Sequence, residues 1–100
     1  MICDLGTHKL AYEISGPASA TSLLFGHCFA SNRHFFDSQL PVLTDYRIIW
    51  YDTRGHGESD TPSGPYRMDD LGNDAVALLD HLQVQETHYV GVSMGGMIGQ

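Results

Sequence analysis

Residues 89–100 read Tyr-Val-Gly-Val-Ser-Met-Gly-Gly-Met-Ile-Gly-Gln, and they are the most informative segment of the chain. The β-branched and aromatic residues before Ser93 favour a strand, and the small and apolar residues after it favour a helix buried against a sheet. Gly91 and Gly95 lie two residues to either side of Ser93. Because side chains at these positions would keep strand and helix apart, the pattern predicts a sharp turn that presents the Ser93 hydroxyl as a nucleophile.

The motif Gly-x-Ser-x-Gly is short, so an ordinary glycine-rich turn between a strand and a helix is the alternative interpretation. The order of strand, serine and helix favours the nucleophile. A catalytic serine needs a general base, an orienting acid and hydrogen-bond donors for the oxyanion that forms when it attacks a carbonyl. The backbone N–H of Met94, at the start of the helix, is the first donor that we predict.

The remaining sequence predicts strands that alternate with helices. The predicted elements are a β-hairpin of strands 2–5 and 8–15, buried strands at 22–26 and 47–51, a short helix at 35–43, a loop at 52–66, and a strand at 87–92. Alternation of this kind is typical of parallel β-α-β units in one layered domain.

One helix precedes the last strand. Its apolar residues recur at helical spacing over about four turns, and these residues are Leu71, Ala75, Leu78, Leu79 and Leu82. Asp69, Asp70 and Asp74 are predicted near its positive amino-terminal end.

The loop Gly26-His27-Cys28-Phe29-Ala30-Ser31 follows the first buried strand directly. Because the carboxyl ends of parallel strands meet at one edge of a sheet, we expect this loop to lie beside Ser93. The backbone N–H of Phe29 is then the second predicted oxyanion donor. The alternative is that residues 26–31 are only a connection.

Three segments resemble the α/β-hydrolase fold family, and the resemblance spans nearly the whole chain. They are Gly26–Phe29, Tyr51–Asp60 and Gly91–Gly96. The resemblance implies that residues 1–100 form the N-terminal part of a single α/β-hydrolase domain, incomplete just after the serine turn. It also implies a mostly parallel sheet flanked by helices and preceded by a β-hairpin.

Shorter stretches resemble the 3-oxoadipate enol-lactonase group. They are Asp37, Gln39-Leu40, Gly64-Pro65-Tyr66 and Asp70-Leu71-Gly72. This resemblance implies hydrolysis of a small carboxylic ester or lactone by a serine triad. The family usually has glycine where Cys28 stands, which leaves the geometry of the Phe29 donor open.

In this family the triad comes in the order Ser, acid, His, and all six histidines precede Ser93. We therefore expect the triad acid and base to be absent from this chain. His56 is expected to shape a turn near the active-site edge. The other histidines outside the loop at 26–31 are expected to be structural or solvent-facing, namely His8, His34, His81 and His88.

Composition excludes several functions. A net charge of -7 with five Lys plus Arg argues against a nucleic-acid or anionic-membrane partner. No metal-ligand spacing, P-loop or dinucleotide fingerprint is present, so neither metal nor cofactor is predicted. Cys3 and Cys28 are expected to be unpaired, with Cys28 buried. Without a signal-like start or a long apolar run, a cytoplasmic location is expected.

The predicted partner is a small ester or lactone, and the oligomeric state stays open. Two alternatives to ester hydrolysis remain. The same fold can carry carbon–carbon bond hydrolysis or cofactor-free perhydrolysis. The chain can also be a non-catalytic truncated fragment that self-associates, because the strand at 87–92 would be an unprotected apolar edge.

Overall fold

A computed structural model describes residues 1–100 and shows one five-stranded sheet. Its strands are β1 (Ile2–Asp4), β2 (Lys9–Ser15), β3 (Ser22–Gly26), β4 (Arg47–Tyr51) and β5 (His88–Gly91). Their order across the sheet is β1-β2-β4-β3-β5. The pairs β1–β2 and β2–β4 are antiparallel, whereas β3 is parallel to both β4 and β5. The prediction of a hairpin followed by a parallel α/β sheet is therefore confirmed.

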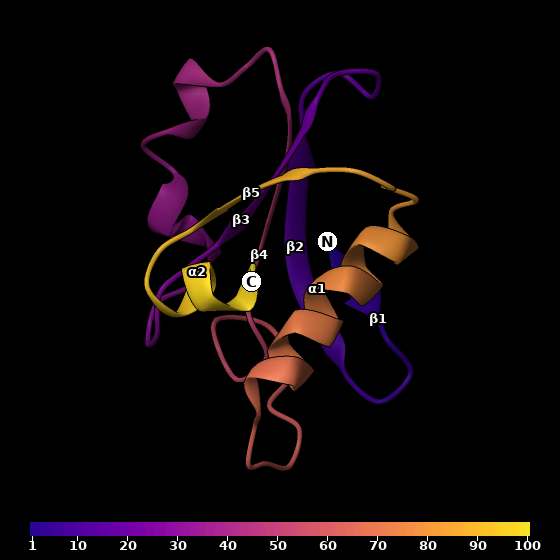
Figure 1. The fold of residues 1–100 in the computed structure, drawn as a ribbon, viewed down its shortest axis with the longest axis vertical. Coiled ribbons are helices and arrows are strands. Elements are labelled where there is room, and N and C mark those ends of the chain that lie inside the picture. Colours follow the sequence, from indigo (N-terminus) through magenta and orange to yellow (C-terminus); the bar gives the residue numbers. More distant parts are fainter.

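Helices and turns cover both faces of this sheet (Figure 1). The α-helices are α1 (Met68–His81) and α2 (Met94–Ile98), and the 3-10 helices are η1 (Arg33–Phe36) and η2 (Leu40–Val42). In Figure 1, α1 runs across the lower right in orange, and the two 3-10 helices lie in purple and magenta at the upper left. Helix α1 has 14 residues, so the predicted length of about four turns is confirmed.

The predicted helix at 35–43 is wrong, because the structure has two short 3-10 turns there. Pro41 occupies the first turn of η2. Proline has no N–H to donate and its ring clashes with the carbonyl four residues earlier, so a continuous α-helix through this position is disfavoured. The Asn32 side chain accepts a hydrogen bond from the His34 N–H at 2.9 Å and starts η1 instead.

One apolar core lies between the sheet and α1. Leu71, Ala75 and Leu78 are buried against sheet residues that include Leu10 and Ile49. Asp69 and Asp70 lie in the first turn of α1, as predicted.

Asp74 does not belong to the first turn of α1. It is 4 % exposed and accepts two hydrogen bonds from the Arg54 guanidinium at 2.6 and 2.8 Å. Asp74 also contacts the His8 ring at 3.0 Å. Its placement near the positive end of the helix was therefore wrong, and the carboxylate joins α1 to the hairpin and to the loop after β4.

A smaller apolar cluster lies on the other face, where Phe25 and Phe36 pack edge to face with ring centres 4.8 Å apart. Beside this cluster is an open apolar hollow of about 370 Å³. Val90 and Val92 line one side of the hollow and are partly exposed. Strand β5 forms the edge of the sheet next to them, because it pairs only with β3.

The register of β3 and β5 positions the site. Gly26 at the end of β3 pairs with Gly91 at the end of β5, so the loops that follow both strands begin side by side. Strand β4 ends on the other side of β3, which brings the loop that starts at Asp52 to the same edge. None of the helices has both the length and the apolar character that crossing a membrane requires.

Candidate active site

Ser93 occupies a strained turn between β5 and α2. It is a non-glycine residue with φ 55° and ψ -112°, a backbone conformation that few residues with a side chain adopt. The Gly95 N–H donates to the Val92 carbonyl at 3.0 Å, and the Met97 N–H donates to the Ser93 carbonyl at 3.1 Å. These bonds fix the turn, and the Ser93 side chain is left exposed at its apex.

Backbone passes backbone closely on both sides of this turn. A Cβ placed on Gly91 would lie 2.5 Å from the Gly95 oxygen. A Cβ placed on Gly95 would lie 2.8 Å from the His27 oxygen and closer still to that of Gly26. Because real Cβ atoms do not approach other atoms within 3.0 Å, a larger residue at either position would displace the turn.

The Tyr89 side chain stabilises the turn around Ser93. Its hydroxyl donates a hydrogen bond to the Gly95 carbonyl at 2.6 Å, which ties α2 to β5. Burial raises the pKa of the Tyr89 phenol, so the hydroxyl keeps the proton that it donates. The Val92 N–H adds a bond to the Gly26 carbonyl at 3.2 Å. The serine turn is therefore joined directly to the start of the loop at 26–31.

That loop carries backbone N–H groups with no hydrogen-bond acceptor within the chain. They belong to His27, Cys28, Phe29 and Ala30. The N–H of Met94, the first residue of α2, has no intrahelical acceptor. Unbonded amides therefore follow both β3 and β5, two parallel strands that end at the same edge of the sheet. The Phe29 N–H belongs to the loop after β3, and the Met94 N–H belongs to the first residue of α2.

His27 is fully buried and links this loop to the end of β4. Its Nε2 accepts the Thr53 N–H at 3.0 Å, and its Nδ1 lies 2.8 Å from the Cys28 carbonyl oxygen. Burial lowers the pKa of the imidazole, with a smaller contribution in the same direction from His56. Neutral His27 therefore adds stability above its ordinary pKa, and this contribution is lost as the pH falls through the lowered value.

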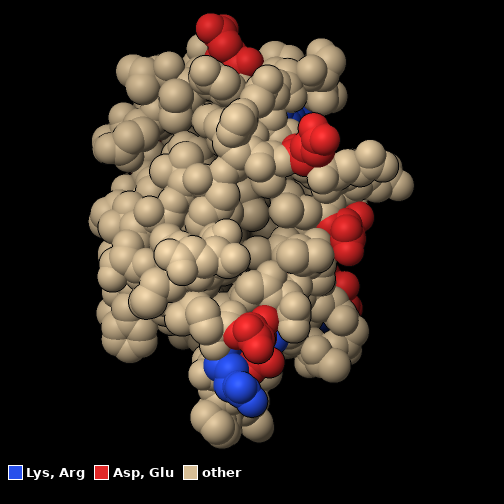
Figure 2. All heavy atoms as spheres, in the orientation of Figure 1, with Lys and Arg blue, Asp and Glu red and all other residues tan.

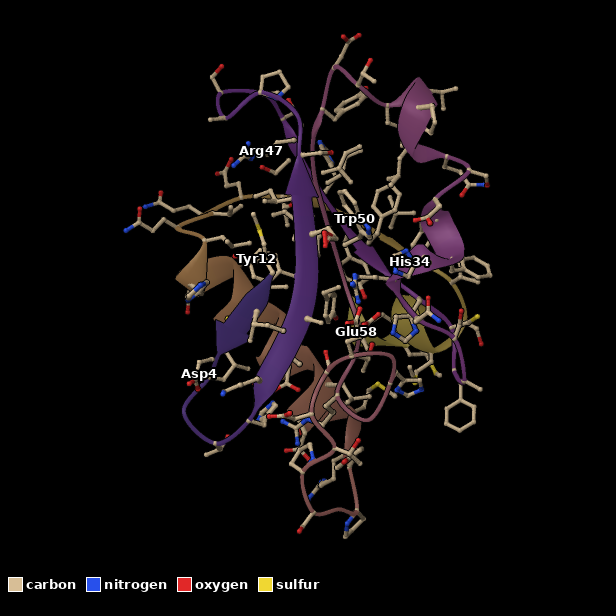
Figure 3. The ribbon with its side chains drawn as sticks, turned by 180° about the vertical axis from the view of Figure 1, so that it is seen from behind. Asp4, Tyr12, His34, Arg47, Trp50 and Glu58 are labelled. Carbon is tan, nitrogen blue, oxygen red and sulfur yellow. The ribbon has the colours of Figure 1, made fainter.

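An ion pair between Arg33, the first residue of η1, and Asp52 links the segments that follow β3 and β4. Asp52 is fully buried and accepts the Arg33 N–H at 2.6 Å, the Arg33 guanidinium at 2.5 Å and the Glu58 N–H at 2.8 Å. The guanidinium also donates to the Glu58 carboxylate at 2.7 Å. Burial acts to lower the pKa of Arg33, but its bonds to Glu58 and Asp52 raise it overall. Figure 3 shows Glu58 on the loop after β4, on the same side of β2 as His34.

No histidine of the chain makes a hydrogen bond to the Ser93 hydroxyl. The His56 Nδ1–H donates to the Arg54 carbonyl oxygen at 3.1 Å. The His56 ring lies 5.1 Å from the ring of His27 and 5.6 Å from that of Phe29. His8 is buried beside Asp74. The exposed histidines are His34, His81 and His88.

Both cysteines are free thiols. Cys3 is fully buried, whereas Cys28 is half-buried in the loop after β3. The expectation that Cys28 would be buried is therefore wrong, because the apolar run that contains it ends with β3.

The structure has no group of three or more His, Cys, Asp or Glu side chains that could hold a metal ion. Figure 2 shows Asp and Glu at the top, along the right side and near the bottom of one face, with the largest group of Lys and Arg atoms at its lower end.

A family model for the alpha/beta hydrolase fold matches residues 21–100. The chain belongs to the α/β-hydrolase family. A 3-oxoadipate enol-lactonase of Acinetobacter baylyi is 47% identical over 92 residues, which are 91% of this chain and 34% of that protein. The crystal structure of the enol-lactonase from Burkholderia xenovorans is similar over 99% of this chain and 39% of that one, with a TM-score of 0.96 and 30% identity.

A hydrolase from Pseudomonas aeruginosa is similar over 99% of this chain and 38% of that one, with a TM-score of 0.95 and 39% identity. This α/β-hydrolase chain spans about a third of the length of the curated relatives that it matches. The resemblance to the α/β-hydrolase fold and to the enol-lactonase group is therefore confirmed.

Sequence reasoning missed three supporting contacts of the candidate site. They are the Tyr89 bond to Gly95, the bridge made by His27, and the ion pair between Arg33 and Asp52. Asp52 offered a signal, because an aspartate directly after a buried strand needs a partner to be buried.

Proposed function

We propose that this chain supplies the nucleophile and the oxyanion donors of a serine hydrolase that acts on a small carboxylic ester or lactone. The observation that carries the proposal is the exposed Ser93 at φ 55°, held beside a loop with unbonded amides. An isolated glycine-rich turn would not need a strained serine at its apex. The names of the similar enol-lactonases supply the substrate class.

In the proposed mechanism, the Ser93 Oγ attacks the carbonyl carbon of the substrate. The N–H groups of Met94 and Phe29 donate hydrogen bonds to the oxyanion of the tetrahedral intermediate. The triad base takes the Oγ proton and gives it to the alcohol or enol oxygen as its bond to the carbonyl carbon breaks. The same base then takes a proton from water, the hydroxide attacks the acyl-serine, and the proton returns to the Ser93 Oγ as the acid is released. Gly91 and Gly95 support the turn by allowing the backbone contacts described above.

We also propose that the Asp and the His of the triad come from residues outside 1–100. No histidine of these residues makes a hydrogen bond to Ser93, and the family order places both partners after the serine. Residues 1–100 are then the first part of one domain. They have no general base of their own, so we expect turnover near background for this stretch alone.

A substrate panel tests the proposal in the complete protein. We expect hydrolysis of a five-membered enol-lactone and of short p-nitrophenyl esters. Cleavage of a vinylogous 1,5-diketone without ester hydrolysis would instead assign carbon–carbon bond hydrolysis, and peracid formation from acetate and hydrogen peroxide as the dominant activity would assign perhydrolysis. A folded complete protein with none of these activities would contradict catalysis and favour a non-catalytic role.

A further inference from the structure

The hydrogen bonds of His27 fix the tautomer of its ring. A backbone N–H can only donate, so the Nε2 atom that lies 3.0 Å from the Thr53 nitrogen must be an unprotonated acceptor. The one proton of a neutral imidazole then sits on Nδ1, which donates to the Cys28 carbonyl oxygen at 2.8 Å. His27 therefore carries a hydrogen bond from the end of β4 into the loop after β3.

The Cys28 carbonyl belongs to the same peptide unit as the Phe29 N–H. The structure has no cis peptide bonds, so these two groups point in opposite directions across one planar unit. Holding the carbonyl toward His27 and the β4 loop therefore turns the N–H away from them. On the other side of β3 from β4 lies β5, which ends in the serine turn.

We infer that His27 is a positioning residue of the oxyanion hole, because its Nδ1–H orients the Cys28–Phe29 peptide and so aims the Phe29 N–H. The inference rests on the proposed function and names a residue that acts through Phe29. The Ser31 N–H also donates to the Cys28 carbonyl, but at 3.3 Å and from within the same loop. His27 alone connects this peptide to the sheet edge at Thr53.

The buried environment of the His27 ring favours one position and the neutral form. His27 has no solvent-exposed surface and packs beside the His56 ring at 5.1 Å, so it has one position. A proton added to Nε2 would face the Thr53 N–H, donor against donor. Burial, assisted by His56, lowers the pKa of His27, whereas Asp52 and the bond to Cys28 act the other way. The net lowering keeps the ring in the neutral form that accepts at one nitrogen and donates at the other.

Two substitutions separate the two ends of the ring. In His27→Asn the amide nitrogen can occupy the place of Nδ1 and donate to the Cys28 carbonyl, but nothing reaches the Thr53 N–H. In His27→Gln the longer side chain can bring its oxygen to the place of Nε2 and accept from Thr53, but the donor to Cys28 is lost. The exposed His81 offers a matched control, His81→Gln.

The experiment measures kcat, KM and Tm of these variants in the complete protein with the preferred ester or lactone. We expect His27→Gln to lower kcat about 10- to 100-fold, less than outright loss of an oxyanion donor costs, with KM within about threefold. We expect His27→Asn to keep kcat within about threefold at a similarly lowered Tm. Equal losses of kcat in both variants, or no loss in His27→Gln, would overturn the inference.

A second readout does not depend on the folding of His27→Gln. Nitrogen-15 spectra of the histidine rings in the unsubstituted complete protein should show the Nδ1–H tautomer for His27, and the Nε2–H tautomer would overturn the inference. If the parent protein hydrolyses no ester or lactone, the proposed function fails on its own. If the parent is active and both His27 variants match it, only the role of His27 fails.

Discussion

Ser93→Ala is expected to lower kcat for ester or lactone hydrolysis by the complete protein about 10⁴- to 10⁶-fold, as removal of a triad serine does. The reason is that no other hydroxyl shares its position at the apex of the turn after β5. The fold should change little, because the Ser93 side chain is exposed and its hydroxyl makes no hydrogen bond within the chain. Stopped assays at high enzyme concentration measure the residual rate.

Ser63→Ala provides the control, because Ser63 is also exposed and makes no side-chain hydrogen bond. It should retain the parent rate. A Ser93→Ala protein with kcat within tenfold of the parent would remove Ser93 from the mechanism. Unchanged Tm values in both variants would show that the loss is chemical and not a loss of folded protein.

Asp52→Ala is expected to lower the free energy of unfolding by about 3–5 kcal/mol, the usual cost of removing one partner of a buried ion pair. Asp52 is fully buried and accepts hydrogen bonds from Arg33 and from the Glu58 N–H. Without it, the buried guanidinium of Arg33 retains the Glu58 carboxylate, which is largely exposed, and the more distant Glu13 carboxylate at 4.0 Å. Urea unfolding of the complete protein measures the loss.

Asp45→Ala is the matched control for Asp52→Ala. Asp45 is exposed and makes no side-chain hydrogen bond, so its removal should change stability by no more than about 0.5 kcal/mol. A loss below about 1 kcal/mol in Asp52→Ala would mean that the ion pair does not hold the segments after β3 and β4 together. The expected loss is a large part of the stability of a typical domain, about 5–15 kcal/mol.

The sheet could be predicted because its strands carry their own signal. Ser22–Gly26 and Arg47–Tyr51 are continuous apolar runs with turn residues nearby, and the structure has strands with these same bounds. The spacing of Leu71, Ala75 and Leu78 predicted α1 for the same reason. The helix predicted at 35–43 had no such periodic signal, and there Pro41 interrupts the hydrogen-bond pattern of an α-helix.

The contacts that position the candidate site could be predicted only in part. The glycines around Ser93 are a local signal, because both lie within two residues of the serine. The contacts they allow are made within the turn itself and with Gly26 and His27 at the end of the neighbouring strand β3. The partners of Asp74 and Asp52 lie elsewhere in the sequence, and only the folded loops bring Arg54 and Arg33 to them. The tautomer of His27 likewise depends on Thr53, which follows a different strand.

The assignment of Ser93 as the nucleophile is tested most directly by locating the residue of the complete protein that reacts with a fluorophosphonate. Such a reagent forms a covalent bond with an activated serine, and peptide mapping by mass spectrometry locates the adduct. We expect one adduct, on Ser93, and none in the Ser93→Ala protein. An adduct on another serine, or an active hydrolase that forms no adduct at Ser93, would contradict this assignment.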